Sequence, residues 1–164
     1  MVSARSPAIL AFQQKTWQLQ RAVLGANAAA TETMARIQSL KRAAQETPGL
    51  DDGLGTDLRG IEARLRDIQE SLNGDPTVSR RQESTPPSLS SRLNGIAGGV
   101  WSSTLGDVTD THKRQYDIVA AEFGGMLERL RALVEVDLQR VEDAAEAAGV
   151  PWTSGRVPRW PPQR

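Results

Sequence analysis

The only histidine of the chain, His112, is the first residue whose type suggests chemistry. It lies in the run TDTHKRQYD, between Asp110 and Asp117. A catalytic or metal-binding histidine needs a partner group, and the chain has no second histidine and no cysteine to provide one. We therefore expect His112 to lie at the surface or to cap a helix.

Carboxylate pairs such as Glu142 and Glu146 are spaced so that both lie on one helix face. A glycoside hydrolase needs two carboxyl groups that face each other across a cleft, so we interpret this pair as part of a solvated surface. The serine-containing runs SLSS and WSST lack a nucleophile elbow, and GIAGG lacks the strand and the lysine of a phosphate-binding loop. The sequence predicts no catalytic residue, no cofactor site and no metal site.

Two groups of residues offer binding chemistry instead. Arg80 and Arg81 could hold a phosphate or a carboxylate, or they could pair with carboxylates of the chain and fix their own loop. Trp152 and Trp160 lie in a proline-rich segment that could recognise a partner in polyproline geometry. We favour loop anchoring for the arginines. For the tryptophans we favour docking on the chain itself, with Trp152 near the end of the preceding helix and Trp160 in a groove between helices.

The composition restricts the class of protein. The chain has 164 residues, of which 38% are apolar and 4% aromatic, as is typical of a helical core built from Ala, Leu, Val and Ile. Twenty basic residues balance twenty acidic ones, so no net charge attracts nucleic acid. No apolar run approaches the roughly 20 residues of a membrane span. We expect neither a nucleic-acid partner nor a membrane span.

Apolar residues recur at helical spacing along most of the chain. The pattern predicts helices over 8–46, 56–72, 88–101 and 109–148, with stops at Pro48, Gly74 and Gly149. The predicted buried positions are Phe12, Thr16, Leu19, Val23, Ala26, Ala30, Thr33, Ile37, Leu40 and Ala44, then Leu54, Leu58, Ile61, Leu65, Ile68 and Leu72, and finally Ala120, Phe123, Leu127, Leu130, Val134, Val141 and Ala144. Asp137 interrupts the last of these series, and we expect it at the rim of the core.

The fold class predicted from these helices is all-α. We expect an antiparallel helical bundle of three long helices plus one weaker helix, the weak one containing Gly95, Gly98 and Gly99. The bundle should occupy residues 1–149, with a long ordered loop over 73–87. Residues 150–164 should form an extended tail, rich in proline and tryptophan, that docks on the bundle.

Several runs resemble a known family: LNGDPTVSRRQESTPPSLSSRL, WSST, YDIVAAEFGGMLERLRALVEVDL and AAGVPWTSGRVPRW. They resemble the C-terminal region of large bacterial proteins with BNR, WD40 or YVTN repeats, described as sortilin-like or as glycosyl hydrolases. The resemblance implies a larger extracytoplasmic protein, periplasmic or secreted, with β-propeller and β-sandwich domains as partners of this segment. The hydrolase name belongs to the propeller, and no Asp-box repeat occurs in this chain, so no catalytic residue is carried over.

These observations predict a non-catalytic helical structural or interaction module at the C-terminal end of a larger secreted β-propeller protein. Two alternatives stay open: a free-standing helical adaptor or self-associating bundle, and a glycan hydrolase in its own right. The N-terminal run MVSARSPAILAFQQK lacks the features of a signal peptide. An export signal is therefore expected in a preceding part of the protein.

Overall fold

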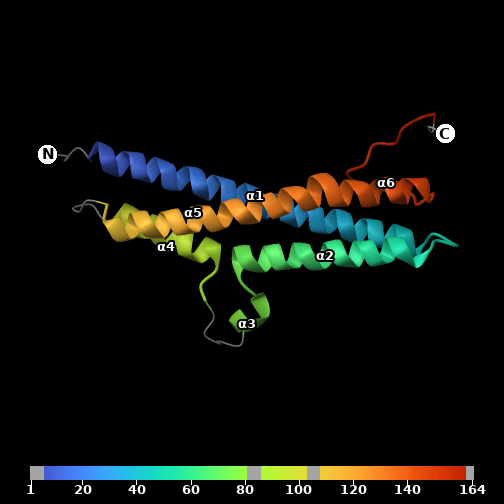
Figure 1. Cartoon of the computed structure of the whole chain (residues 1–164), viewed down its shortest axis with the longest axis horizontal. Coiled ribbons are helices and arrows are strands. Elements are labelled where there is room, and N and C mark those ends of the chain that lie inside the picture. Colours follow the sequence, from blue (N-terminus) through green and yellow to red (C-terminus); the bar gives the residue numbers. More distant parts are fainter. Residues whose placement is uncertain (1–5, 81–85, 103–107, 162–164) are drawn as a thin grey trace. The chain divides into compact units, whose positions relative to one another are not determined.

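The computed structural model describes residues 6–80, 86–102 and 108–161. The described residues form an all-α fold, as predicted (Figure 1). The helices are α1 (Pro7–Gln45), α2 (Asp52–Asn73), α3 (Pro76–Arg80), α4 (Leu89–Ser102), α5 (Asp110–Arg131) and α6 (Gln139–Ala147). A π-helical segment, η1 (Ala132–Leu138), joins α5 to α6 without a break.

The helix boundaries follow local capping chemistry. Helix α2 begins one turn earlier than predicted, because the Asp51 carboxylate accepts a hydrogen bond from the Gly53 N–H and so caps the helix. The short helix α3 was not predicted. Its start is capped by Asp75, whose Oδ1 accepts hydrogen bonds of 2.7 Å from both the N–H and the hydroxyl of Thr77. The other predicted helices are confirmed to within a residue or two.

The chain forms two compact units, each assembled from separate segments. Unit 1 comprises Met1–Asn27 and Ile68–Glu128, and unit 2 comprises Ala28–Asp67 and Arg129–Arg164. Each unit buries its own apolar residues: Leu19, Val23, Leu72, Leu93 and Phe123 are among those of unit 1, and Ile37, Leu40, Leu58, Leu65 and Leu138 among those of unit 2. The division of the chain into a bundle over 1–149 and a tail over 150–164 stays a prediction.

In unit 1 the first part of α1 packs against α4 and α5. The rings of Phe12 and Tyr116 meet edge to face at 5.6 Å between centroids. Arg92 of α4 forms an ion pair with Glu122 of α5, which shows that these two helices lie side by side. Nearly all the buried positions predicted on α1 are buried, Phe12 being only partly so.

The loop between α2 and α4 returns to the point at which it leaves. Gly74 adopts φ +81°, a left-handed conformation that terminates α2 as predicted. The Ser90 hydroxyl, in the first turn of α4, then donates a 3.4 Å hydrogen bond to the Asn73 side chain. Because both ends are close together, the segment is a side excursion between two helices. Residues 81–85 within it lie outside the described residues, so its predicted order stays a prediction.

In unit 2 the second part of α1 forms a hairpin with α2. The core of this hairpin contains Ile37, Leu40, Leu58, Ile61 and Leu65, all of which are almost completely buried. Gly49 adopts φ +74° in the turn between the helices, at the predicted stop. The predicted buried positions of α2 are confirmed without exception.

The last long helix departs from the predicted pattern. Burial of Phe123, Leu130 and Val141 is confirmed, but the other fully buried positions are Tyr116, Val119, Met126, Leu133, Leu138 and Ala145. Ala144 is exposed, and Ala120, Leu127 and Val134 are only partly buried. The wider turn of η1 places Leu133 and Leu138, five residues apart, on the same side of the helix. Asp137 consequently lies at the rim, where it pairs with Arg64 at 2.7 Å.

Candidate functional site

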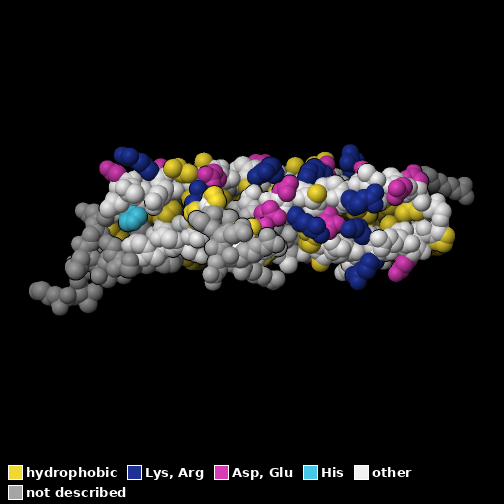
Figure 2. All heavy atoms as spheres, turned by 90° about the horizontal axis from the view of Figure 1, so that it is seen from below, with side chains coloured by type: hydrophobic (Ala, Val, Ile, Leu, Met, Phe, Trp, Pro, Cys, Tyr) yellow, Lys and Arg dark blue, Asp and Glu magenta, His cyan; other side chains and the backbone are white. Residues whose placement is uncertain are grey.

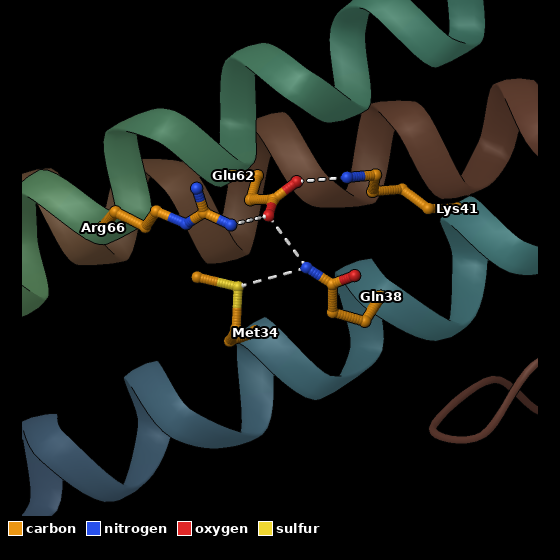
Figure 3. Close-up of polar contacts among 5 residues, drawn as sticks. All are labelled: Met34, Gln38, Lys41, Glu62 and Arg66. Carbon is orange, nitrogen blue, oxygen red and sulfur yellow. Dashed lines mark hydrogen bonds and ion pairs between the residues drawn. The ribbon is translucent and has the colours of Figure 1, made fainter.

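The polar side chains gathered around Glu62 form the most elaborate cluster in unit 2, shown in Figure 3. Glu62 extends from α2 toward α1, and its side chain is only 7% exposed. Its Oε1 accepts a 2.9 Å hydrogen bond from Gln38 Nε2 and an ion-paired hydrogen bond from Arg66. Its Oε2 accepts from Lys41 Nζ. Both carboxylate oxygens are therefore occupied by donors of the chain itself.

The electrostatics of this cluster keep Glu62 ionised. The hydrogen bond from Lys41 lowers the pKa of Glu62 below its ordinary value, and Gln38 and Arg66 act in the same direction. Burial opposes this effect by raising the pKa, but it does not outweigh the donors. A general acid needs a proton to give at neutral pH, and Glu62 has none there. The cluster is suited to hold α1 against α2.

A second buried glutamate, Glu142, contradicts its interpretation as part of a solvated surface. Glu142 of α6 accepts a 2.6 Å hydrogen bond from Arg36 of α1, and its side chain is almost completely buried. Glu146, four residues on, stays partly exposed. The pair is thus divided between core and rim and does not face a cleft. The partner that draws Glu142 inward is 106 positions away in the chain, so no local pattern reveals it.

The tail after α6 is anchored by a residue that sequence analysis missed. Gly149 adopts φ +77°, and the Val150 N–H donates a 2.9 Å hydrogen bond to the Ala145 carbonyl, which turns the chain back. The side chain of Arg156 is only 6% exposed. Its Nη2 donates a 3.0 Å hydrogen bond to the Glu142 carbonyl oxygen and lies 3.7 Å from the Glu146 carboxylate.

The two tail tryptophans occupy different environments. Trp152 is partly exposed and stacks on the Arg156 guanidinium, 4.6 Å from ring centroid to Cζ. Trp160 is 89% exposed, so the prediction that it fills a groove between helices is wrong. The physical reason is that Arg156 already provides the polar anchor of the tail, and the chain beyond it, with Val157 also exposed, makes no buried contact in the described residues.

Replacing Arg156 by alanine is expected to lower the free energy of unfolding by about 1–3 kcal/mol, because a buried charge-assisted hydrogen bond and its ion pair are lost. Replacing Trp160 by alanine, the matched control in the same tail, should change it by less than about 0.5 kcal/mol. Urea unfolding followed by circular dichroism measures both values. Equal losses for the two variants would show that Arg156 does not anchor the tail.

The remaining candidate residues form no reactive constellation. His112 is partly buried at the start of α5, where Thr109 Oγ1 accepts its backbone N–H at 3.3 Å and Gly99 of α4 leaves space for its ring. Arg81 and the side chain of Arg80 lie outside the described residues, so their anchoring role stays a prediction. Within the described ranges, no group of three or more His, Asp or Glu residues could hold a metal ion.

The largest hollow, of about 810 Å³, lies in unit 1 between the start of α1 and the start of α5. Its charged lining residues already pair with carboxylates of the chain. Lys15 lies 3.7 Å from Asp117, and Lys113 lies 3.3 Å from Asp110. On the face of the molecule that Figure 2 presents, basic and acidic side chains alternate in the same way. That face therefore offers no extended patch of one charge.

Large apolar side chains at the surface are the other notable feature. Leu10, Trp17 and Leu24 of α1 are 51%, 50% and 68% exposed. They follow one another at intervals of seven residues, so they lie along one face of the helix. We call these three residues the α1 stripe. A shallow groove of about 210 Å³ runs beside it, between Trp17 and Leu24 on α1 and Leu93 and Asn94 on α4.

The described helices also lack any segment long and apolar enough to cross a membrane. Comparison of the chain with models of known protein families, with curated protein sequences and with solved structures gives no match.

Proposed function

We propose that this chain is a non-catalytic helical module that serves a larger extracytoplasmic β-propeller protein as a structural or interaction end. The observation that carries the interaction role is the α1 stripe. Three large apolar side chains are aligned along one helix face and turned away from the core. Apolar side chains that are gathered on a surface mark a contact with another protein more often than those scattered singly.

The non-catalytic part of the proposal is supported by how the buried carboxylates are used. Glu62 and Glu142 both accept hydrogen bonds from cationic side chains of α1. Carboxyl groups that catalyse glycoside hydrolysis must instead leave one group protonated and both groups open to the substrate. The arrangement in unit 2 is that of helix-to-helix anchors.

The larger protein enters the proposal through the sequence resemblance. The runs GDPT, TPPS and PWTSGRVPRW are its most specific parts. In such proteins a β-propeller precedes the helical region, and the whole is secreted or attached to the cell envelope. The partners proposed for this module are accordingly the propeller and sandwich domains of the same polypeptide.

An antibody raised against this module tests the proposal in extracts of cells that produce it naturally. The expected result is a polypeptide much longer than 17.8 kDa, found in the periplasmic or secreted fraction. A single band at 17.8 kDa in the cytoplasmic fraction would contradict it and would favour the alternative, a free-standing adaptor or self-associating bundle. Mass spectrometry of the purified band identifies the segments that accompany the module.

A further inference from the structure

The α1 stripe is symmetric about its central residue. Leu10 lies seven residues before Trp17, and Leu24 lies seven residues after it. Seven residues are close to two helical turns and drift by only about 20° around the helix axis. The three side chains therefore form a short ridge that reads the same in both directions along the helix.

We propose that the occupant of this stripe is the same stripe on a second copy of the chain, packed antiparallel about a two-fold axis at Trp17. The proposal rests on the proposed function of the chain as an interaction module and names the partner of its exposed face. In this arrangement Trp17 meets the Trp17 of the second copy, and each Leu10 meets a Leu24. A two-fold contact of this kind requires a surface that is complementary to itself, which the symmetric spacing provides.

The residues beside the stripe also match in the antiparallel register. Gln14 and Gln20 lie three residues before and after Trp17, so the Gln14 of one copy faces the Gln20 of the other. Gln13 and Arg21 lie four residues before and after it and face each other in the same way. Amide and guanidinium groups supply both donors and acceptors for hydrogen bonds across such an interface.

Charge selects the antiparallel orientation. Between Pro7 and Thr31, α1 carries Lys15 and Arg21 but no acidic residue. A parallel pair would place the two Arg21 side chains against each other, whereas the antiparallel pair separates each Arg21 from the other by eight residues, or about 12 Å along the axis. Lys15 points to another side of the helix, toward Asp117 of α5.

The groove beside the stripe gives the second copy space to dock. Trp17, Val23 and Leu24 form its α1 wall, and Leu93 of α4 closes the opposite side. Leu10 of the second copy would pack on Leu24 at the mouth of this groove. Three large side chains with their polar neighbours make a small interface compared with the roughly 800 Å² per partner of a stable complex. We therefore expect a dimer that dissociates in the micromolar range.

Sedimentation velocity of the purified chain, from low micromolar to submillimolar concentration, measures this association. The expected result is a reversible monomer–dimer equilibrium. Trp17→Ser and Leu24→Gln should each raise the dissociation constant about tenfold or more. Trp160→Ser, which alters an even more exposed tryptophan outside the stripe, should leave it unchanged. Circular dichroism checks that every variant keeps its helical content.

Disulfide cross-linking tests the orientation, because the natural chain has no cysteine. Copies that carry Gln14→Cys are mixed with copies that carry Gln20→Cys and are oxidised gently. The antiparallel register predicts that the mixed dimer forms faster than either homodimer. Faster homodimer formation would mean parallel packing and would overturn the proposal.

The other outcomes separate this inference from the proposed function. A chain that stays monomeric throughout, or a dimer that Trp17→Ser and Leu24→Gln leave intact, would overturn the pairing. If the chain is monomeric and Trp17→Ser weakens its binding to a propeller domain of the longer polypeptide, the proposed function stands and only the second copy is excluded. An acidic amphipathic helix captured by the stripe would exclude it in the same way.

Discussion

Deletion of Ala35 from α1 is expected to abolish cooperative folding, whereas deletion of Val136 from η1 leaves the chain folded. Ala35 is exposed in the interior of a regular α-helix. Its removal rotates every later residue of α1 by about 100° relative to the first part of the helix. Ile37, Leu40 and Ala44 would leave the core of unit 2. Each large core side chain lost costs about 2–5 kcal/mol, and the whole domain has only about 5–15 kcal/mol to lose.

Removal of Val136 has the opposite consequence for the register. Leu133 and Leu138 are both buried although five residues separate them, and Val136 is exposed. Deleting Val136 makes the step from Leu133 to Leu138 four residues, as a regular α-helix requires. The buried side chains then keep their places, and we expect the free energy of unfolding to change by less than about 1.5 kcal/mol.

Far-ultraviolet circular dichroism and urea unfolding measure both deletions. Ala35 is the matched control for Val136, because each deletion removes one exposed helical residue. If neither variant folds, the π-helical turn itself is required for the fold. If both fold with equal stability, helix register does not govern the core.

Replacement of Glu62 by glutamine is expected to lower the free energy of unfolding by about 2–3 kcal/mol at neutral pH. The glutamine keeps the size of the side chain but removes the charge that Lys41 and Arg66 neutralise. Breaking a fully buried ion pair costs about 3–5 kcal/mol, because the remaining charge loses both its partner and water. Here the side chains of Lys41 and Arg66 are 26% and 62% exposed, so water can solvate them and the loss is smaller.

The effect of this substitution should depend on pH. The pKa of Glu62 is lowered from its ordinary value of 4.5, so its ion pairs stabilise the fold fully above pH 4.5. This stabilisation is lost as the pH falls through the lower pKa of the folded state, where the natural side chain also becomes neutral. The difference in unfolding free energy between the natural chain and Glu62→Gln should therefore shrink in acid.

Urea unfolding at a series of pH values measures this difference. Glu128→Gln, at an exposed position of α5, is the control and should show little effect at any pH. A constant difference between the natural chain and Glu62→Gln down to strongly acidic pH would show that the ion pairs are not its source.

The sequence by itself determined the helices and most of the core positions. The buried series of α1 and α2, from Thr16 to Ala44 and from Leu54 to Leu72, was predicted because a helix repeats its faces every three to four residues. The stops near Pro48, at Gly74 and at Gly149 were predicted because backbone restriction acts within a residue or two. The apolar residues of the α1 stripe could also have been noticed, since their sevenfold spacing is a local pattern.

Only the tertiary structure decided which charged residues enter the core. Glu62 and Glu142 look like surface glutamates in the sequence, and they are buried because Lys41 and Arg36 reach them from another helix. The anchoring of the tail by Arg156 rather than Trp160 depends in the same way on a carbonyl group of α6. The energy of an ion pair or hydrogen bond depends on the distance between its atoms in space. That distance is set only when segments far apart in the chain have packed together.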